Sequence, residues 1–122
     1  MSLLVVPVVL VALAAGPECV VWGSVSCVPC KAVSAEAAEL GKQGWPIEYL
    51  NVEDQPEVAQ TWGVGAYPTV VVFTRGAGNR VSLLGRVAGV LDKAKLVAFM
   101  RKHGVAVRKA RSAAKWESGS YL

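Results

Sequence analysis

Four short apolar runs punctuate the chain, and polar or turn-forming residues separate them. Residues 18–24 (ECVVWGS) are β-branched and aromatic with few charges, which is typical of a buried strand. The same pattern predicts three further strands, at residues 45–52, 70–73 and 80–87. A loop with two glycines, residues 74–79, separates the last two strands, so they are expected to pair as a hairpin.

Three helices are predicted between and after these strands. In residues 32–43, apolar side chains recur at the spacing of one helix face. A second helix is expected over residues 54–62, with Asp54 as its cap and Pro56 in its first turn. Asp92 precedes the third helix, which has its own apolar side.

The order of elements is therefore β-α-β-α-β-β-α. Two strands joined by a helix indicate a parallel pair, and the closing hairpin is antiparallel. We expect an α/β domain over residues 16–104, with a mixed central sheet and helices on both faces.

Residues 1–17 carry no charged side chain, and residues 3–15 are almost wholly apolar. Residues 1–15 fit a secretory signal, although no Lys or Arg precedes the apolar run. They also fit a membrane contact, although the run is shorter than the ~20 residues of a spanning helix. A third interpretation makes them the first strand and a short helix of the domain. The sequence thus leaves open whether the protein is cytoplasmic or exported and membrane-associated.

The formal net charge of +4 is unevenly distributed. Residues 1–100 carry seven Lys or Arg against eight acidic residues, a balance of −1, whereas residues 101–122 carry six against one, a balance of +5. A nearly neutral body argues against specific nucleic-acid binding. The basic tail, residues 105–122, is interpreted as a solvated extension. The alternative is a contact with acidic lipids, nucleic acid or a partner.

Residues 26–31 (SCVPCK) are the candidate reactive site. Cys27 and Cys30 lie where a predicted strand ends and a helix begins. Unpaired backbone N–H groups and the helix dipole stabilise a thiolate there, so the pKa of Cys27 is expected to be depressed. The spacing brings the two sulfurs together on one helical turn, so the pair can close a disulfide. We expect Cys27 to be exposed and to attack a substrate disulfide, and the more buried Cys30 to resolve the mixed disulfide.

Other roles for the cysteines fit less well. A purely structural pair of thiols does not explain the strand–turn–helix context. A zinc site from Cys19, Cys27, Cys30 and His103 has poor ligand spacing, because Cys19 lies within a strand and His103 beyond the last helix. Cys19 is interpreted instead as a small buried hydrophobic side chain.

The CVPCK motif and its surroundings resemble the thioredoxin family over about residues 16–100. The residues that carry the resemblance are Gly16-Pro17, Cys27 to Lys31, Asn51-Val52 with the acids that follow, Trp62-Gly63-Val64, Tyr67-Pro68-Thr69, and residues 89–93 leading to Phe99. Together these spacings are far more specific than an isolated CxxC.

The resemblance implies a thioredoxin fold and thiol–disulfide exchange with protein substrates. It implies that Pro68 is a cis-proline facing the cysteines, that the backbone beside it pairs with an extended substrate segment, and that Tyr67 tunes which thiols are accepted. The implied partners are protein disulfides or dithiols and an upstream thiol reductase or oxidant. No metal or organic cofactor is needed, since the cysteines carry the electrons. We expect a monomer.

The chain departs from the family pattern near the cysteines. Ser26 and Val28 stand where the family usually has Trp and Gly. Val21 stands where thioredoxins bury an Asp, and Tyr49 where a Lys faces that Asp. The lost acid–base pair leaves open whether the protein is a reductase, an oxidant or an isomerase. We expect Val28 and Pro29 to move the redox potential away from that of thioredoxin. The alternative function is a binding or assembly module that uses the basic tail or the apolar N-terminus.

Overall fold

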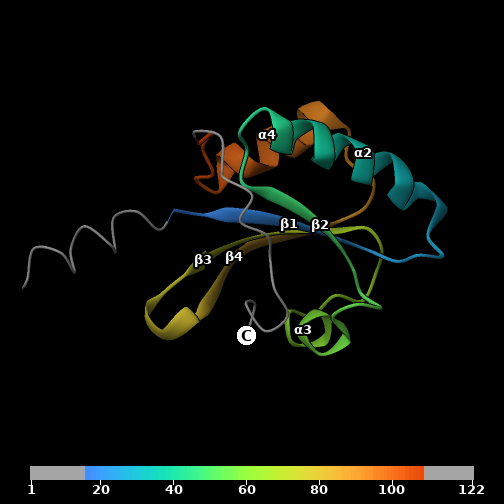
Figure 1. The fold of residues 1–122 in the computed structure, drawn as a ribbon, viewed down its shortest axis with the longest axis horizontal. Coiled ribbons are helices and arrows are strands. Elements are labelled where there is room, and N and C mark those ends of the chain that lie inside the picture. Colours follow the sequence, from blue (N-terminus) through green and yellow to red (C-terminus); the bar gives the residue numbers. More distant parts are fainter. Residues whose placement is uncertain (1–15, 109–122) are drawn as a thin grey trace, which may run out of the picture.

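The computed structural model describes residues 16–108, and Figure 1 shows the arrangement of their strands and helices. The elements in chain order are β1 (Glu18–Gly23), α2 (Val28–Lys42), β2 (Ile47–Asn51), α3 (Pro56–Thr61), β3 (Thr69–Arg75), the 3-10 helix η2 (Ala77–Asn79), β4 (Val81–Ala88) and α4 (Lys93–Lys102). This confirms the predicted order, with a 3-10 turn added inside the β3–β4 loop. The predictions for residues 1–15 and 109–122 lie outside the described residues. Within residues 16–108, no helix is both long and apolar enough to cross a membrane.

The strands form one four-stranded sheet in the order β2-β1-β3-β4. β1 and β2 run parallel, with Val21 opposite Tyr49, as two strands joined by a helix require. β3 is antiparallel to β1, with Thr69 opposite Trp22, and β4 is antiparallel to β3. The predicted mixed sheet, with one parallel pair and a closing hairpin, is therefore confirmed.

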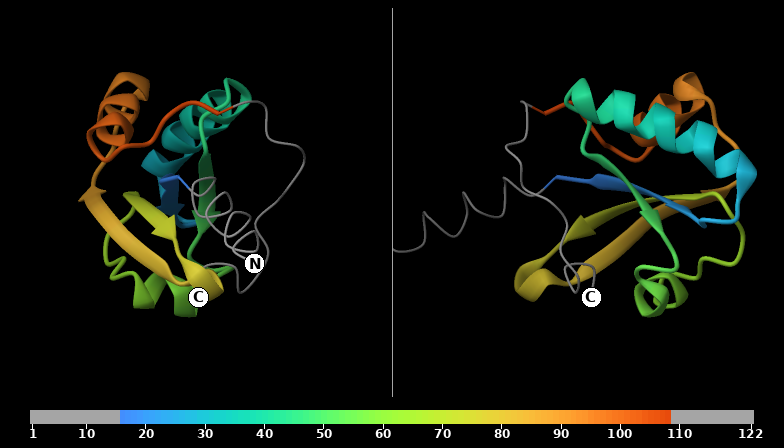
Figure 2. Two further views of the ribbon diagram at one scale, coloured as in Figure 1. Left: turned by 90° about the vertical axis from the view of Figure 1, so that its left-hand side faces the viewer. Right: turned by 45° about the vertical axis from the view of Figure 1, so that its right-hand side comes forward.

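Helices cover both faces of the sheet, α2 and α4 on one face and α3 on the other (Figures 1 and 2). Side chains alternate along β1 between these two layers. Cys19 and Val21 belong to the core on the side of α2 and α4, and Val20 and Trp22 to the core on the side of α3. All four are fully buried. Because β1 is covered on both sides, its sequence is a continuous apolar run rather than an alternating one.

The start of α2 agrees with the cysteine motif and differs from the apolar pattern. The helix begins at Val28, earlier than the residues 32–43 that the apolar spacing indicated, and so includes Pro29 and Cys30 in its first turn, where the motif was expected to lie. Cys27 is the N-cap residue, with an extended backbone (φ −90°, ψ 106°), and Pro29 fits the first turn because its fixed φ is already helical.

Of the two predicted caps of the other helices, one is wrong and one is confirmed. The prediction that Asp54 caps α3 is wrong: the N-cap is Gln55, which makes no side-chain cap bond. Asp54 instead lies in the turn after β2, where its backbone N–H donates to the carbonyl of Asn51 at 3.0 Å. Asp92 does cap α4, since its side chain accepts a 2.9 Å hydrogen bond from the backbone N–H of Lys95.

The strand register brings several connections to the same edge of the sheet. Gly23 at the end of β1 lies beside Asn51 at the end of β2. Trp22 lies beside Thr69, and Thr69 lies beside Ala88. The segment that leads to Cys27, the turn after β2, the residues just before β3 and those just after β4 therefore meet at this edge.

The first residues of the basic tail pack at the opposite edge. Val105 is buried, and the backbone N–H of Arg108 donates to the carbonyl of Gly44 at 2.7 Å. The Arg108 guanidinium also donates to the carbonyl of Pro17 at 3.0 Å. Residues 105–108 thus close the domain where β1 and β2 begin, away from the cysteines.

Candidate functional site

Cys27 and Cys30 form a disulfide at the N-terminus of α2, with their Cα atoms 5.3 Å apart. Cys27 is partly exposed, whereas Cys30, one turn into the helix, is 1% exposed. The predicted difference in exposure between the two cysteines is present, although Cys27 is less exposed than expected. The backbone N–H of Cys30 donates to the carbonyl of Cys27 at 3.2 Å, which anchors the motif in the first turn.

The Tyr67–Pro68 peptide bond is cis, as the resemblance implied. Pro68 is buried and its carbonyl accepts a 2.9 Å hydrogen bond from the backbone N–H of Gly89, while Tyr67 is 45% exposed. The Thr69 hydroxyl donates to the carbonyl of Ala66 at 2.6 Å, which closes a tight turn before β3. Because Thr69 lies beside Trp22, this turn sits at the same sheet edge as the segment that carries the cysteines.

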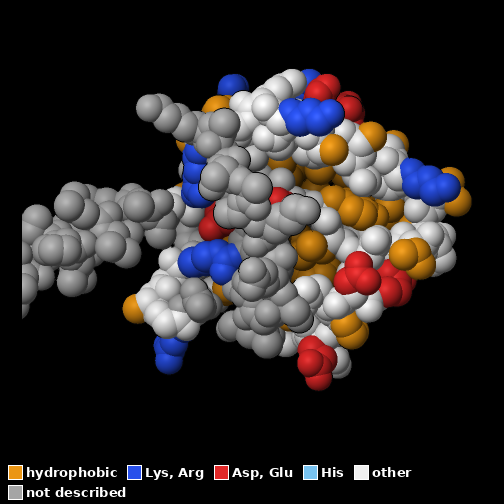
Figure 3. Space-filling view, in the orientation of Figure 1, with side chains coloured by type: hydrophobic (Ala, Val, Ile, Leu, Met, Phe, Trp, Pro, Cys, Tyr) orange, Lys and Arg blue, Asp and Glu red, His pale blue; other side chains and the backbone are white. Residues whose placement is uncertain are grey.

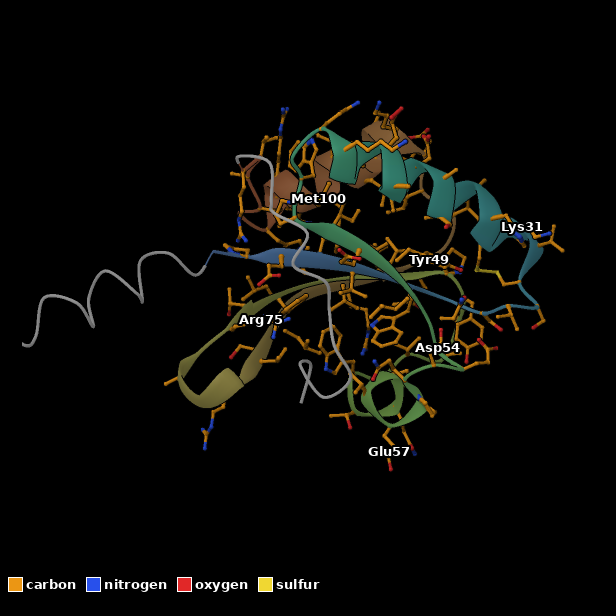
Figure 4. All side chains as sticks on the ribbon, in the orientation of Figure 1. Lys31, Tyr49, Asp54, Glu57, Arg75 and Met100 are labelled. Atoms are coloured by element: carbon orange, nitrogen blue, oxygen red, sulfur yellow. A yellow bond between two sulfur atoms is a disulfide. The ribbon has the colours of Figure 1, made fainter. Side chains whose placement is uncertain are left out.

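Apolar side chains are exposed at this edge of the sheet. Val25, Val28 and Val90 are 70%, 76% and 55% exposed, although they are large hydrophobic residues. Hydrophobic and acidic side chains lie next to each other on the face in Figure 3. In Figure 4, Lys31 lies on α2, and Asp54 and Glu57 lie on the side of α3.

A pocket of about 380 Å³ lies beside the site. Its walls are Val52, Glu53, Pro56, Ala59, Gln60, Val64 and Tyr67. The pocket therefore connects the cis-proline turn with α3.

Val21 and Tyr49 occupy the positions at which the family has its buried acid–base pair. They are direct neighbours in the parallel β1–β2 register, and Val21 is fully buried. The Tyr49 hydroxyl lies over the backbone of Gly23, so a side chain at residue 23 would collide with it. Burial first, and then the charge of Glu53, raise the pKa of Tyr49 above its usual value, so the hydroxyl stays protonated at neutral pH. Neither side chain can take a proton from Cys30 there.

Glu53 is a residue of the site to which the sequence analysis assigned no role. Its carboxylate accepts hydrogen bonds from the Ser24 hydroxyl at 2.5 Å and from the backbone N–H of Val25 at 3.2 Å. The pKa of Glu53 is lowered mainly by the hydrogen bond from the Ser24 hydroxyl and next by that from its own backbone N–H. Desolvation opposes this, and the backbone N–H of Val25 lowers the pKa slightly further. The available signal was an acid directly after the second strand, at the edge that the cysteines share.

Cys19 is far from this chemistry. It is fully buried within β1, and burial raises the pKa of its thiol well above the usual value. His103 packs against Phe99 with ring centroids 4.7 Å apart. Among residues 16–108, no group of three or more His, Cys, Asp or Glu side chains is placed to hold a metal ion. The structure therefore does not assemble the zinc site considered from the sequence.

A disulfide at a helix N-terminus, a cis-proline at the same sheet edge and a mixed sheet between helices define a domain of the thiol–disulfide oxidoreductase class. The family model described as thioredoxin matches residues 12–102, and the chain belongs to the thioredoxin family.

Curated relatives agree with this assignment. The chain is 30% identical over 79 residues to a thioredoxin of Chlamydia caviae, covering 63% of this chain and 72% of the relative. It is 31% identical over 80 residues to a thioredoxin of Pyropia yezoensis, covering 63% and 70%.

Solved structures show the same fold. A thioredoxin of Plasmodium falciparum superposes with a TM-score of 0.60 at 16% identity, covering 80% of each chain. A reduced thioredoxin pre-protein of Schistosoma mansoni superposes with a TM-score of 0.60 at 21% identity, covering 80% of this chain and 89% of that one. The predicted thioredoxin fold is confirmed.

Proposed function

We propose that the protein exchanges electrons with protein disulfides and dithiols through Cys27 and Cys30. One observation carries the proposal: a partly exposed Cys27 at the N-terminus of α2 is joined to a buried Cys30 one turn further on. A substrate sulfur can approach only the exposed member. Cys27 is therefore the nucleophile, and Cys30 is the resolving thiol.

The exchange has two steps when the reduced protein acts on a substrate disulfide. The Cys27 thiolate attacks one substrate sulfur, forms a mixed disulfide and releases the other substrate sulfur as a thiolate. Cys30 loses its proton and attacks the Cys27 sulfur, which forms the Cys27–Cys30 disulfide and releases the second substrate thiolate. The substrate gains two electrons and the protein loses two. An upstream thiol reductase then restores the dithiol, and an oxidant partner would run the cycle in reverse.

Helix geometry supports the role of Cys27. Cys27 is the N-cap residue of α2, where the helix dipole is positive. This end of the dipole favours the thiolate over the thiol, which makes Cys27 the better nucleophile and the better leaving group.

The cis-proline turn and the pocket supply a place for the substrate. An extended substrate segment would pair with the backbone beside Pro68, while Tyr67 contacts the residues that flank its cysteine. The pocket of about 380 Å³ next to Tyr67 accepts one side chain of that segment. The exposed Val25 and Val28 favour apolar residues on the other side of the disulfide.

The departures from the family bear on the redox potential and on the resolving step. Val21 accepts no proton, so Cys30 must transfer its proton to water or to a group of the substrate. Val28 and Pro29 lie between the two cysteines and set the relative stability of dithiol and disulfide. Thioredoxin has a reduction potential of about −270 mV, and we expect the potential of this protein to differ from it. The potential is measured by equilibrating the purified protein in graded thiol buffers and counting the alkylated cysteines by mass. A value equal to that of thioredoxin would contradict this expectation.

A trapping experiment tests the exchange itself. Cys30→Ser leaves Cys27 without its resolving partner, so mixed disulfides with a protein substrate such as insulin should accumulate. Cys27→Ser is the matched control and should trap nothing, because the remaining thiols, Cys30 and Cys19, are buried. If Cys30→Ser trapped nothing either, exchange would be excluded, and the binding or assembly module would become the better account.

A further inference from the structure

The short loop between β1 and α2 carries the nucleophile, and it is tied to the turn after β2. Ser24, at the start of the loop, is 6% exposed, and its hydroxyl donates to one carboxylate oxygen of Glu53 at 2.5 Å. The backbone N–H of Val25 donates to the other oxygen at 3.2 Å. One side chain, 28 residues away from Val25 in the sequence, thus binds two consecutive residues of the loop.

Further hydrogen bonds continue from Ser24 towards Cys27. The Ser24 and Ser26 hydroxyls lie 3.2 Å apart, and the backbone N–H of Ser26 donates to the Ser24 hydroxyl at 3.4 Å. The backbone N–H of Cys27 donates to the Ser24 carbonyl at 3.0 Å. Ser24 is therefore the residue through which Glu53 is linked to the nucleophile.

The loop has little else to hold it. Val25 and Ser26 are exposed, and the Cys27 side chain makes no cap hydrogen bond to the backbone of α2. A carboxylate that accepts hydrogen bonds binds more strongly than a neutral acceptor, so Glu53 is the strongest tether among these contacts.

The geometry points to Glu53 as a positioning residue that acts through Ser24 to hold Cys27 at the N-terminus of α2 in the orientation for attack. This inference rests on the proposed exchange function. Attack on a disulfide needs the incoming thiolate in line with the bond that breaks, so an oriented nucleophile reacts faster than a mobile one. A nucleophile held at the helix end also keeps the favourable effect of the helix dipole.

Four variants separate positioning from simple charge. Ser24→Ala removes the hydroxyl that links Glu53 to the loop but leaves the carboxylate charge in place, and Ser24→Thr restores a hydroxyl. Glu53→Gln removes the charge and weakens the tether. Asp54→Asn is the matched control, because it removes the same charge one residue along the chain, from an exposed acid in the turn after β2.

The experiment uses the full chain with Cys30→Ser in every variant, so that Cys27 is the only accessible thiol. The second-order rate constant for reaction of Cys27 with 5,5′-dithiobis(2-nitrobenzoate) is measured from pH 5 to pH 10. Each profile gives the pKa of Cys27 and the limiting rate constant of its thiolate. Circular dichroism confirms that each variant is folded.

We expect Ser24→Ala and Glu53→Gln each to lower the limiting rate constant by about threefold to tenfold, the effect of one lost hydrogen bond. Ser24→Ala should also raise the pKa of Cys27, because the thiolate loses its fixed place at the helix end. Ser24→Thr and Asp54→Asn should stay within about twofold of the parent. The double variant that carries Ser24→Ala and Glu53→Gln should have about the same limiting rate constant as the slower of the two single variants, because both changes break the same tether.

The contrary results are distinct. A Ser24→Ala profile equal to that of the parent would overturn the inference. So would an Asp54→Asn loss as large as that of Glu53→Gln, since charge alone would then explain the effect. If the parent itself failed to react, the proposed function would fall as well, whereas a reactive parent with unaffected variants removes only the role of Glu53.

Discussion

Val21→Asp places a carboxyl group at the position where the family buries an acid, and its effect can be worked out from this structure. Val21 is fully buried in the layer between the sheet and α2 and α4. Its neighbours on the adjoining strands are Tyr49 and Val70. The Tyr49 hydroxyl lies over Gly23, further along β1. Restoring the acid alone would thus bury a carboxyl group without the Lys that accompanies it in the family.

The magnitude has two parts. Loss of the buried valine costs about 1.5–3 kcal/mol, and an unpaired neutral carboxyl adds about 1–3 kcal/mol. The second part depends on pH, because burial raises the pKa of an Asp at this position by about 3 units above its unfolded value of about 3.9. The folded state then binds the proton more tightly than the unfolded state. Stability is highest at low pH and falls between about pH 4 and pH 7, most steeply midway, by about 1.4 kcal/mol per pH unit.

Urea denaturation of the oxidised protein at pH 4, 5, 6 and 7 measures this dependence. Val21→Asn is the control, because it has a similar size and polarity but does not titrate. We expect the deficit of Val21→Asp relative to Val21→Asn to grow by about 3 kcal/mol from pH 4 to pH 7. A deficit that stays constant over this range would show that the carboxyl finds water or a partner at residue 21, and would refute the reasoning.

Three further predictions concern the buried thiol and the packing of α2. Burial raises the pKa of Cys19 above its usual 9.0, so the folded chain keeps a proton that the unfolded chain loses. The free energy of unfolding of the wild type should therefore fall by about 1.4 kcal/mol per pH unit above pH 9, relative to that of Cys19→Ala. Equal slopes in urea titrations of the oxidised proteins between pH 8.5 and 10.5 would contradict this. Glu36→Ala should lower the free energy of unfolding by about 1–2 kcal/mol, because Glu36 accepts a 2.9 Å hydrogen bond from the backbone N–H of Lys93 at the start of α4. An unchanged urea midpoint would show that this hydrogen bond contributes nothing to stability. Leu40→Ala, at a fully buried position, should lower the free energy of unfolding by about 2–5 kcal/mol, and Leu84→Ala, at an exposed one, by less than about 1 kcal/mol; similar losses would contradict the assigned core.

The elements and the reactive cysteines could be predicted because their signals are local. A short apolar β-branched run between turn residues, such as residues 18–24, predicts a strand, and the spacing of Cys27 and Cys30 follows from one helical turn. Local signals predicted the first and last residues of helices and strands less well than the elements themselves. Asp54 has the chemistry of a helix cap, but the backbone turn after β2 delays α3, so that Gln55 takes that place.

The sequence by itself determined the α/β order, the cysteine pair and the likeness to one family, because each depends on residues close together in the chain. Only the tertiary structure decided that Glu53 binds Ser24 and that Tyr49 lies over Gly23. These contacts depend on the β1–β2 register, which places Asn51 beside Gly23 and so brings the turn after β2 to the segment that carries Cys27. A hydrogen bond between residues far apart in the sequence leaves no periodic pattern in it. Such contacts exist only once the packed sheet has set which strand ends meet.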